Sequence, residues 1–261
     1  MGTLTLKLDL TPILIMTASL AGRRWGQAIG GWLVGLPLTS GPIAFFIAIE
    51  QGPQFAARAA EGSLAGTAAQ ACFCLAYGAL ADRSWGAALL AGSLAFATVG
   101  ALLDFAHPGL PALVILVTAS LVIALWLMPT PASDNDTATK PPGWDLPTRM
   151  AMATGLVVAL TAMAPVLGPR LSGLLATFPI FAMVLAVFAH RHQGSAAARR
   201  VLSGLLAGLI AFASVFLVLR LGLEYLGIAP SFIFAGVVGV IVQACSLRGL
   251  LRRQAERQGS E

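Results

Sequence analysis

The sequence predicts an all-α integral membrane protein with about nine transmembrane helices, built from two inverted four-helix repeats plus one linking helix. Three observations predict this fold: long apolar runs, an internal repeat and an uneven distribution of basic residues. The chain is 57% hydrophobic and 10% charged, with a mean hydropathy of +0.85. A soluble domain carries about 25% charged residues, so this chain cannot cover itself with a water-facing surface.

Apolar runs near the bilayer-crossing length of about 20 residues follow one another along the chain. They lie at 5–22, 27–49, 56–80, 85–106, 110–128, 148–168, 170–190, 197–219 and 222–246. Helices are expected throughout, because lipid offers the backbone no hydrogen-bond partner. Within the first run, Lys7 and the apolar stretch from Leu10 to Leu20 have the pattern of a secretory signal. Asp9, and the match of this run to 147–168 in the second repeat, favour a retained helix instead.

An ungapped repeat relates residues 31–71 to residues 173–213 at an offset of 142, with 15 identities in 41 positions. Composition alone does not explain so many matches, so duplication of one unit is expected. The identities include Pro37/Pro179, Gln51-Gly52/Gln193-Gly194, Arg58/Arg200 and Gly62-x-Leu64-Ala65-Gly66/Gly204-x-Leu206-Ala207-Gly208. A period this long suits the two halves of a membrane transporter.

The repeat divides the chain into five parts. We expect a first membrane repeat at 1–108, a linking transmembrane helix at 109–128, a Pro-rich cytoplasmic linker at 129–146, a second repeat at 147–247 and a basic cytoplasmic tail at 248–261. Because five helices precede the second repeat, the two repeats have opposite orientations in the membrane.

Basic residues give an independent test of this topology. Four of the 16, Lys7, Arg58, Arg170 and Arg220, fall on the face that holds the N-terminus, and the other 12 fall on the opposite face. By the positive-inside rule, the N-terminus is expected outside and the C-terminus in the cytoplasm.

Prolines near the middle of two equivalent runs indicate a binding site. An interior proline frees the carbonyl four residues before it, here those of Leu33, Leu38 and Leu175. Interrupted helices at matching places in inverted repeats are typical of a transporter's midplane site. The candidate substrate-binding residues are Gly35, Pro37, Thr39, Ser40, Gly41, Pro42, Thr177 and Pro179. The alternative is that the prolines only kink the helices.

Charged residues supply further candidates. Arg58 and Arg200 begin equivalent helices and could hold an anionic group. The alternatives are pairing with Glu50 or Glu61 and snorkelling of the side chain into the membrane interface. Glu50 and Asp104 are the candidate coupling carboxylates. The Gly62-x-x-x-Gly66 and Gly204-x-x-x-Gly208 patterns predict close helix packing.

No catalytic residue, metal site or cofactor is predicted, and we expect no enzyme activity. The three cysteines, Cys72, Cys74 and Cys245, lie inside apolar runs without metal-ligand spacing. Walker, nucleophile-elbow and His-Glu-x-x-His motifs are missing from the sequence. The chain has a net charge of +5, but its basic residues lie between the membrane runs, which argues against a nucleic-acid partner.

The segment from Gly173 to Gly194, with Phe178-Pro179 and then His190-Arg191-His192, resembles the GlpM family of small bacterial inner-membrane proteins. The likeness covers about one repeat, so this chain resembles a fused, inverted pair of such units. The first repeat departs from the pattern at Leu36-Pro37 and at Gly41-Pro42. The resemblance implies a multi-pass protein of the bacterial inner membrane and implies no substrate.

Two functions compete on this basis. The first is a secondary-transporter-like carrier of a small polar or lipid-linked solute, with its site at the broken helices. The second is a non-transporting accessory or scaffold of envelope biogenesis, which the lack of a buried mid-span charge favours. The lipid bilayer is the expected partner in both cases, and a homo-oligomer is compatible with either.

Overall fold

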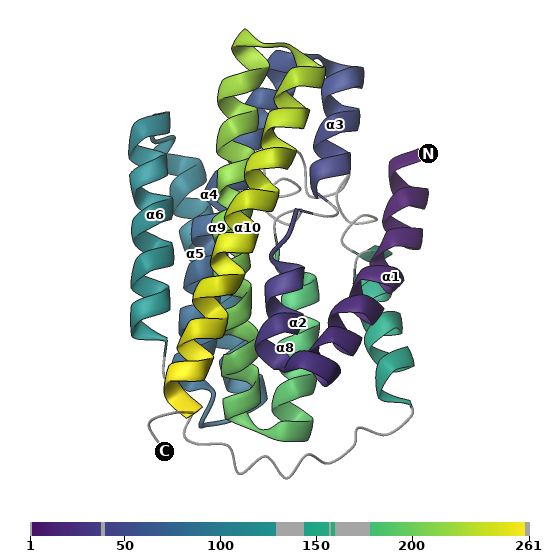
Figure 1. Cartoon of the computed structure of the whole chain (residues 1–261), viewed down its shortest axis with the longest axis vertical. Helices are drawn as coiled ribbons and strands as arrows, with labels where there is room; N and C mark the ends of the chain where they lie inside the picture. Colours follow the sequence, from purple (N-terminus) through teal and green to yellow (C-terminus); the bar gives the residue numbers. More distant parts are fainter. Residues whose placement is uncertain (1, 38–39, 129–143, 157, 160–177, 259–261) are drawn as a thin grey trace.

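The computed structural model describes residues 2–37, 40–128, 144–156, 158–159 and 178–258 (Figure 1). Its helices are α1 (Gly2–Trp25), α2 (Gln27–Val34), α3 (Ser40–Gln51), α4 (Pro53–Leu80), α5 (Trp85–Ala106), α6 (Leu110–Leu127), α8 (Ile180–Gln193), α9 (Ser195–Tyr225) and α10 (Ile228–Gln258). Residues 145–156 are helical as well, and no strand occurs in the described ranges.

Five of the described helices are long and apolar enough to cross a membrane. They are α4, α5, α6, α9 and the part of α10 from Ile228 to Gly249. In contrast, α2, α3 and α8 have only 8, 12 and 14 residues. The predicted class, an all-helical multi-pass membrane protein, is therefore confirmed in part, and the count of nine spans stays a prediction.

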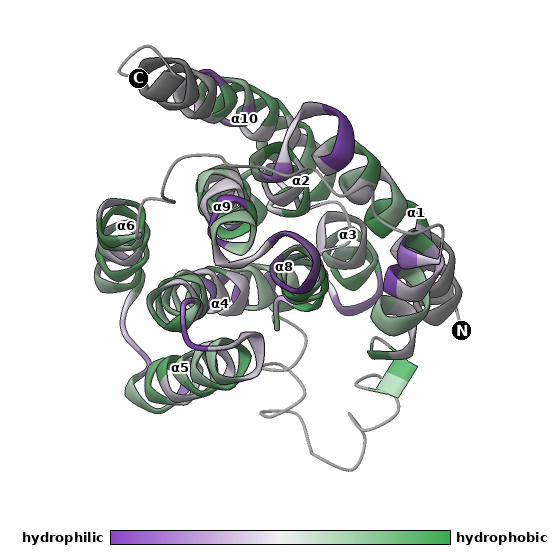
Figure 2. Ribbon diagram, turned by 90° about the horizontal axis from the view of Figure 1, so that it is seen from below, coloured by the Kyte–Doolittle hydropathy of each residue, from purple (hydrophilic) through white to green (hydrophobic). Residues whose placement is uncertain are grey.

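The centre of the molecule is the antiparallel pair α4 and α9. Asp82, just after α4, contacts Arg199 at the start of α9, and Glu61 near the start of α4 contacts Arg220 near the end of α9. Of the apolar stretch in each helix, 61% of α4 and 67% of α9 is buried, against 22% in α5, α6 and α10. Seen from below, α5, α6 and α10 lie outside this pair (Figure 2).

Side-chain size explains which helices lie inside. The buried residues of α4 are mainly alanine and glycine, and such small side chains let neighbouring helix backbones pack closely in a membrane. The outer helices instead expose large apolar side chains, such as Phe105 (88% exposed), Trp126 (82%) and Val240 (72%). So large an exposed apolar surface fits lipid and would favour aggregation in water.

Glycines join α2 to α9 at backbone distance. A Cβ added to Gly204 would lie 2.6 Å from the carbonyl carbon of Ala28, and one added to Gly35 would lie 2.6 Å from Cα of Gly208. The prediction of close packing at Gly204 and Gly208 is thus confirmed. At Gly62, the equivalent of Gly204, the residue is exposed and no described atom lies within 4 Å of an added Cβ.

Candidate functional site

The helix expected at 27–49 is interrupted where the sequence places Pro37. Helix α2 ends at Val34, and α3 begins at Ser40. Gly35 is buried, and Leu36 and Pro37 are half-buried. The interruption therefore lies inside the protein and separates two half-length helices.

One backbone carbonyl on each side of this interruption accepts a local hydrogen bond. The Leu36 N–H donates to the Leu33 carbonyl at 3.2 Å, and the Gly41 N–H donates to the Pro37 carbonyl at 2.8 Å. The Leu33 carbonyl, expected to need a ligand or water, thus has a protein partner three residues away. The carbonyls of Leu38 and Leu175 lie outside the described residues.

The equivalent proline of the second repeat stands at a helix start. Pro179 directly precedes α8, and its carbonyl accepts from the Met183 N–H at 2.8 Å. A proline fits this position because its fixed φ, here −79°, suits entry into a helix. Thr177 and the residues before it lie outside the described part of the chain.

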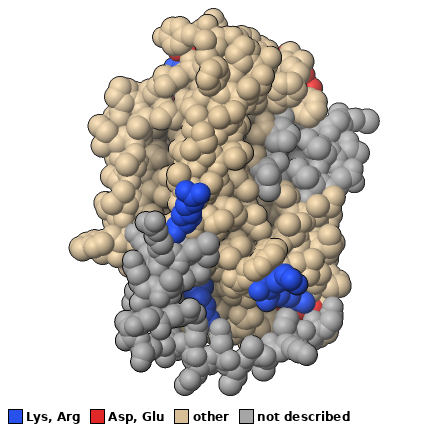
Figure 3. All heavy atoms as spheres, viewed as in Figure 1, with Lys and Arg blue, Asp and Glu red and all other residues tan. Residues whose placement is uncertain are grey.

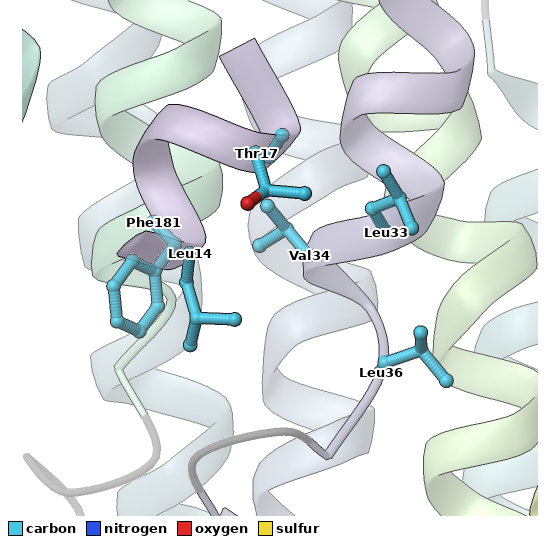
Figure 4. A pocket seen from close by; sticks show the side chains of 7 residues that line it. Leu14, Thr17, Leu33, Val34, Leu36 and Phe181 are labelled. Carbon is cyan, nitrogen blue, oxygen red and sulfur yellow. The ribbon is translucent and has the colours of Figure 1, made fainter. Parts of the chain in front are cut away.

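A small pocket opens beside the interruption, between α1, α2 and α8 (Figure 4). Its volume is about 40 Å³, and its lining residues are Leu14, Thr17, Ala18, Leu33, Val34, Leu36 and Phe181. Thr17 is the one polar residue among them, and its hydroxyl donates to the Ile13 carbonyl of its own helix at 2.8 Å. The pocket is therefore an apolar surface at the helix break.

The predicted site residues are not all gathered at this pocket. Gly35 packs against Gly208 of α9, while Ser40 and Gly41 begin α3 and are half-buried. Pro42 lies in the first turn of α3, and Thr39 lies outside the described residues. The polar cavity expected from these hydroxyls is thus not among the described features.

The predicted charged residues lie at helix ends, away from the pocket. Arg58 is exposed near the start of α4, and Arg200 is half-buried near the start of the antiparallel α9. They therefore fall toward opposite ends of the helix pair. Glu50 and Asp104 are exposed in the last turns of α3 and α5, and neither lines the pocket.

A buried carboxylate gathers two arginines and a histidine near the ends of α1 and α8. Asp145, whose side chain is fully buried, lies 2.6 Å from Arg23 of α1, 3.0 Å from Arg149 and 3.3 Å from Nε2 of His192 in α8. The Arg149 guanidinium also stacks on the Phe188 ring, and Trp144 packs edge-on against His192. This Asp145 cluster ties α1, α8 and the helical segment 145–156 together.

A second polar network holds α9 to the end of α4. The Arg199 guanidinium donates to the Asp82 carboxylate and to the Gly78 carbonyl, and the Ser195 hydroxyl donates to Asp82 at 2.9 Å. These hydrogen bonds, first that of Arg199, lower the pKa of Asp82 below its usual value. Nearby, Tyr77 and Nδ1 of His190 lie 3.2 Å apart.

The opposite end of the α4–α9 pair carries its own ion pairs. Arg220 contacts Glu61 at 3.0 Å and Glu224 at 2.8 Å. On the face drawn in Figure 3, most of the described surface is tan, and basic side chains show near mid-height and in the lower half.

Fold and surface together define an all-helical, membrane-embedded multi-pass protein. Comparison of the chain with protein-family models, with curated proteins and with solved structures finds no match. Among the described residues, no group of three or more His, Cys, Asp or Glu is placed to hold a metal ion.

Sequence reasoning missed the Asp145 cluster. The one local signal is that Asp145 and Arg149 stand four residues apart, a spacing that brings side chains together on a helix. Arg23 and His192 join them only through the tertiary fold, and the sequence itself shows His192 only beside His190 and Arg191.

Proposed function

We propose that this chain is a secondary-transporter-like carrier whose site lies at the interrupted helix between α2 and α3. The observation that carries the proposal is the interruption itself, placed inside the protein and beside a pocket. Half-helices at the core of a membrane protein let one part of the fold pivot against another. Because the pocket is apolar, its lining favours the lipid-linked solute over a small polar one.

Matching element boundaries support the two-repeat architecture that such a carrier needs. Helices α3 and α8 end at Gln51 and Gln193, and α4 and α9 begin at Pro53 and Ser195, both pairs at an offset of 142. The glycines between them, Gly52 and Gly194, have nearly equal positive φ values of 89° and 85°.

Helix contacts follow the same correspondence. Helix α5 packs on α4 as α10 packs on α9, and α5 touches α8 as α10 touches α3. The antiparallel course of α4 and α9 is what an inverted repeat requires. We accordingly infer two inverted units, a fused pair resembling the GlpM family, in a bacterial inner membrane with the N-terminus outside.

The alternative is a non-transporting scaffold, and one observation favours it. Glycines 31, 35, 204 and 208 fix α2 to α9 at backbone distance, which limits how far α2 can move alone. A carrier must then move α2 and α9 as one body, against α1 and α8. A scaffold needs no such motion.

Two-sided access to the pocket separates the two functions without knowledge of the solute. Cys72, Cys74 and Cys245 are first replaced by Ala, and Val34→Cys then places a thiol in the pocket. A membrane-impermeant maleimide is added to right-side-out and to inside-out vesicles. A carrier should be labelled from both faces, whereas labelling from one face or neither would support the scaffold.

Exposed positions give the matched controls. Glu50→Cys and Arg83→Cys lie in exposed segments toward opposite ends of α4. Each should react in only one of the two vesicle orientations, which establishes that the vesicles are sealed and oriented.

A further inference from the structure

The Asp145 cluster has more positive than negative charge in a largely buried place. Two guanidiniums, which stay protonated in proteins, face the single carboxylate of Asp145. The Arg149 side chain is 4% exposed, so its charge has little access to water. Since buried charges need pairing, the described residues of the cluster leave room for one more anion.

One side of the cluster reaches the surface. The Arg23 side chain is 30% exposed and that of His192 is 24% exposed. Trp144, 59% exposed, packs against the His192 ring, and Trp25, 61% exposed, lies under the Arg24 guanidinium. Tryptophan beside arginine is typical of the headgroup level of a membrane protein.

The cluster and the apolar pocket are joined by the same helices. Along α1, Arg23 lies six residues after Thr17 of the pocket, which corresponds to about 9 Å of helix. Along α8, His192 lies eleven residues after Phe181, which corresponds to about 16 Å. Both helices therefore have basic residues at one end and line an apolar pocket farther along. An anionic lipid has the matching features, a charged headgroup and an apolar acyl chain.

We propose that α1, α8 and the segment 145–156 bind a phosphate-bearing lipid, with its headgroup at Arg23 and His192 and its acyl chain toward the pocket at Val34. Arg23 donates hydrogen bonds to the phosphate oxygens, while Asp145 holds Arg23 and Arg149 in place. This inference rests on the proposed function in taking the pocket as the carrier's site, and it names the substrate class.

Lipid binding to the purified full-length chain tests the inference. Native mass spectrometry measures the affinity for phosphatidylglycerol and for phosphatidylcholine in detergent. The wild-type chain should bind phosphatidylglycerol more tightly than phosphatidylcholine. Arg23→Gln should lower the affinity for phosphatidylglycerol about tenfold, the loss expected for one charge-assisted hydrogen bond. Arg83→Gln removes an exposed arginine outside the cluster and should change the affinity less than twofold.

Further variants separate headgroup, chain and competing anions. Val34→Phe fills the pocket and should lower the affinity for both lipids, because both carry acyl chains. Millimolar inorganic phosphate should not displace phosphatidylglycerol, whereas full displacement would assign the cluster to a free anion. Asp134 and Asp136 are the carboxylates of the linker sequence between Pro129 and Trp144. Asp134→Asn with Asp136→Asn should leave the affinity unchanged, and a tenfold gain would show that these carboxylates supply the anion.

Equal affinity for the two lipids, or equal effects of Arg23→Gln and Arg83→Gln, would overturn the lipid site. Arg23 is chosen over the more buried Arg149 so that the variant folds, which gel filtration and tryptophan fluorescence verify. The proposed function fails separately: selective lipid binding with one-sided labelling of Val34→Cys would keep the site and refute the carrier.

Discussion

Replacing Gly204 with alanine tests whether α2 and α9 truly meet at backbone distance. The added Cβ would lie 2.6 Å from the Ala28 carbonyl carbon and 2.9 Å from the Trp32 nitrogen, and both are backbone atoms that no side-chain rotation can move. Overpacking of this kind costs about 1–3 kcal/mol. We expect the upper part of that range, because two backbone atoms of α2 must shift together.

Gly62→Ala is the matched control, because Gly62 is the repeat equivalent of Gly204 and is exposed. Both variants gain about 0.5–1 kcal/mol from exchanging glycine for alanine within a helix. That gain cancels between them, so the difference in their unfolding free energies isolates the clash.

Thermal unfolding in detergent is the assay. At about 2–4 °C per kcal/mol for a chain of this size, a clash of about 3 kcal/mol should place Gly204→Ala roughly 6–12 °C below Gly62→Ala. Equal melting temperatures would refute the close approach of α2 and α9, and with it the argument that they move as one body.

Two further predictions concern the ionic networks. Asp145→Asn removes the one carboxylate of the Asp145 cluster and should lower the free energy of unfolding, measured by chemical denaturation, by about 3 kcal/mol. This value is near the low end for a broken buried pair, because Arg23 and His192 are partly exposed. An effect as small as that of Asp104→Asn, at an exposed position, would contradict this prediction. The lowered pKa of Asp82 means that its stabilising contacts with Arg199 are present above the unfolded-state pKa near 3.8 and are lost as the pH falls through the lower folded-state pKa. Asp82→Asn should therefore flatten the acid side of a melting-temperature profile, and an unchanged profile would show that the pair contributes nothing.

The membrane helices were predictable because lipid leaves the chain few options. Helices α5 and α6 agree within one residue with the predicted runs 85–106 and 110–128. Each apolar run ends just before a proline, Pro108 or Pro129, so the apolar pattern and the proline mark the same helix end. Helix α10 instead continues to Gln258, well past the predicted end at 246. Its basic last turns are good helix formers outside the apolar pattern, and that pattern alone set the predicted boundary.

The candidate site was predicted only in part, for a physical reason. Pro37 fixes where the helix breaks, so the break could be predicted. What surrounds the break depends on packing: a tight turn gives the Leu33 carbonyl a partner in Leu36, and Thr17 bonds to its own helix. The contact of Arg23 with Asp145, 122 residues away in sequence, likewise depends on the tertiary fold and has no local signal.

Lipid translocation in reconstituted vesicles tests the central claim most directly. Fluorescently labelled phosphatidylglycerol is followed as a membrane-impermeant quencher destroys only the outer-leaflet label. The wild-type chain should make the inner-leaflet label accessible. Pro37→Ala should slow this step, because a regular helix replaces the break, while Pro53→Ala with Pro111→Ala, at helix starts, should not. No translocation above protein-free vesicles, or full activity of Pro37→Ala, would contradict a carrier that works through its interrupted helix.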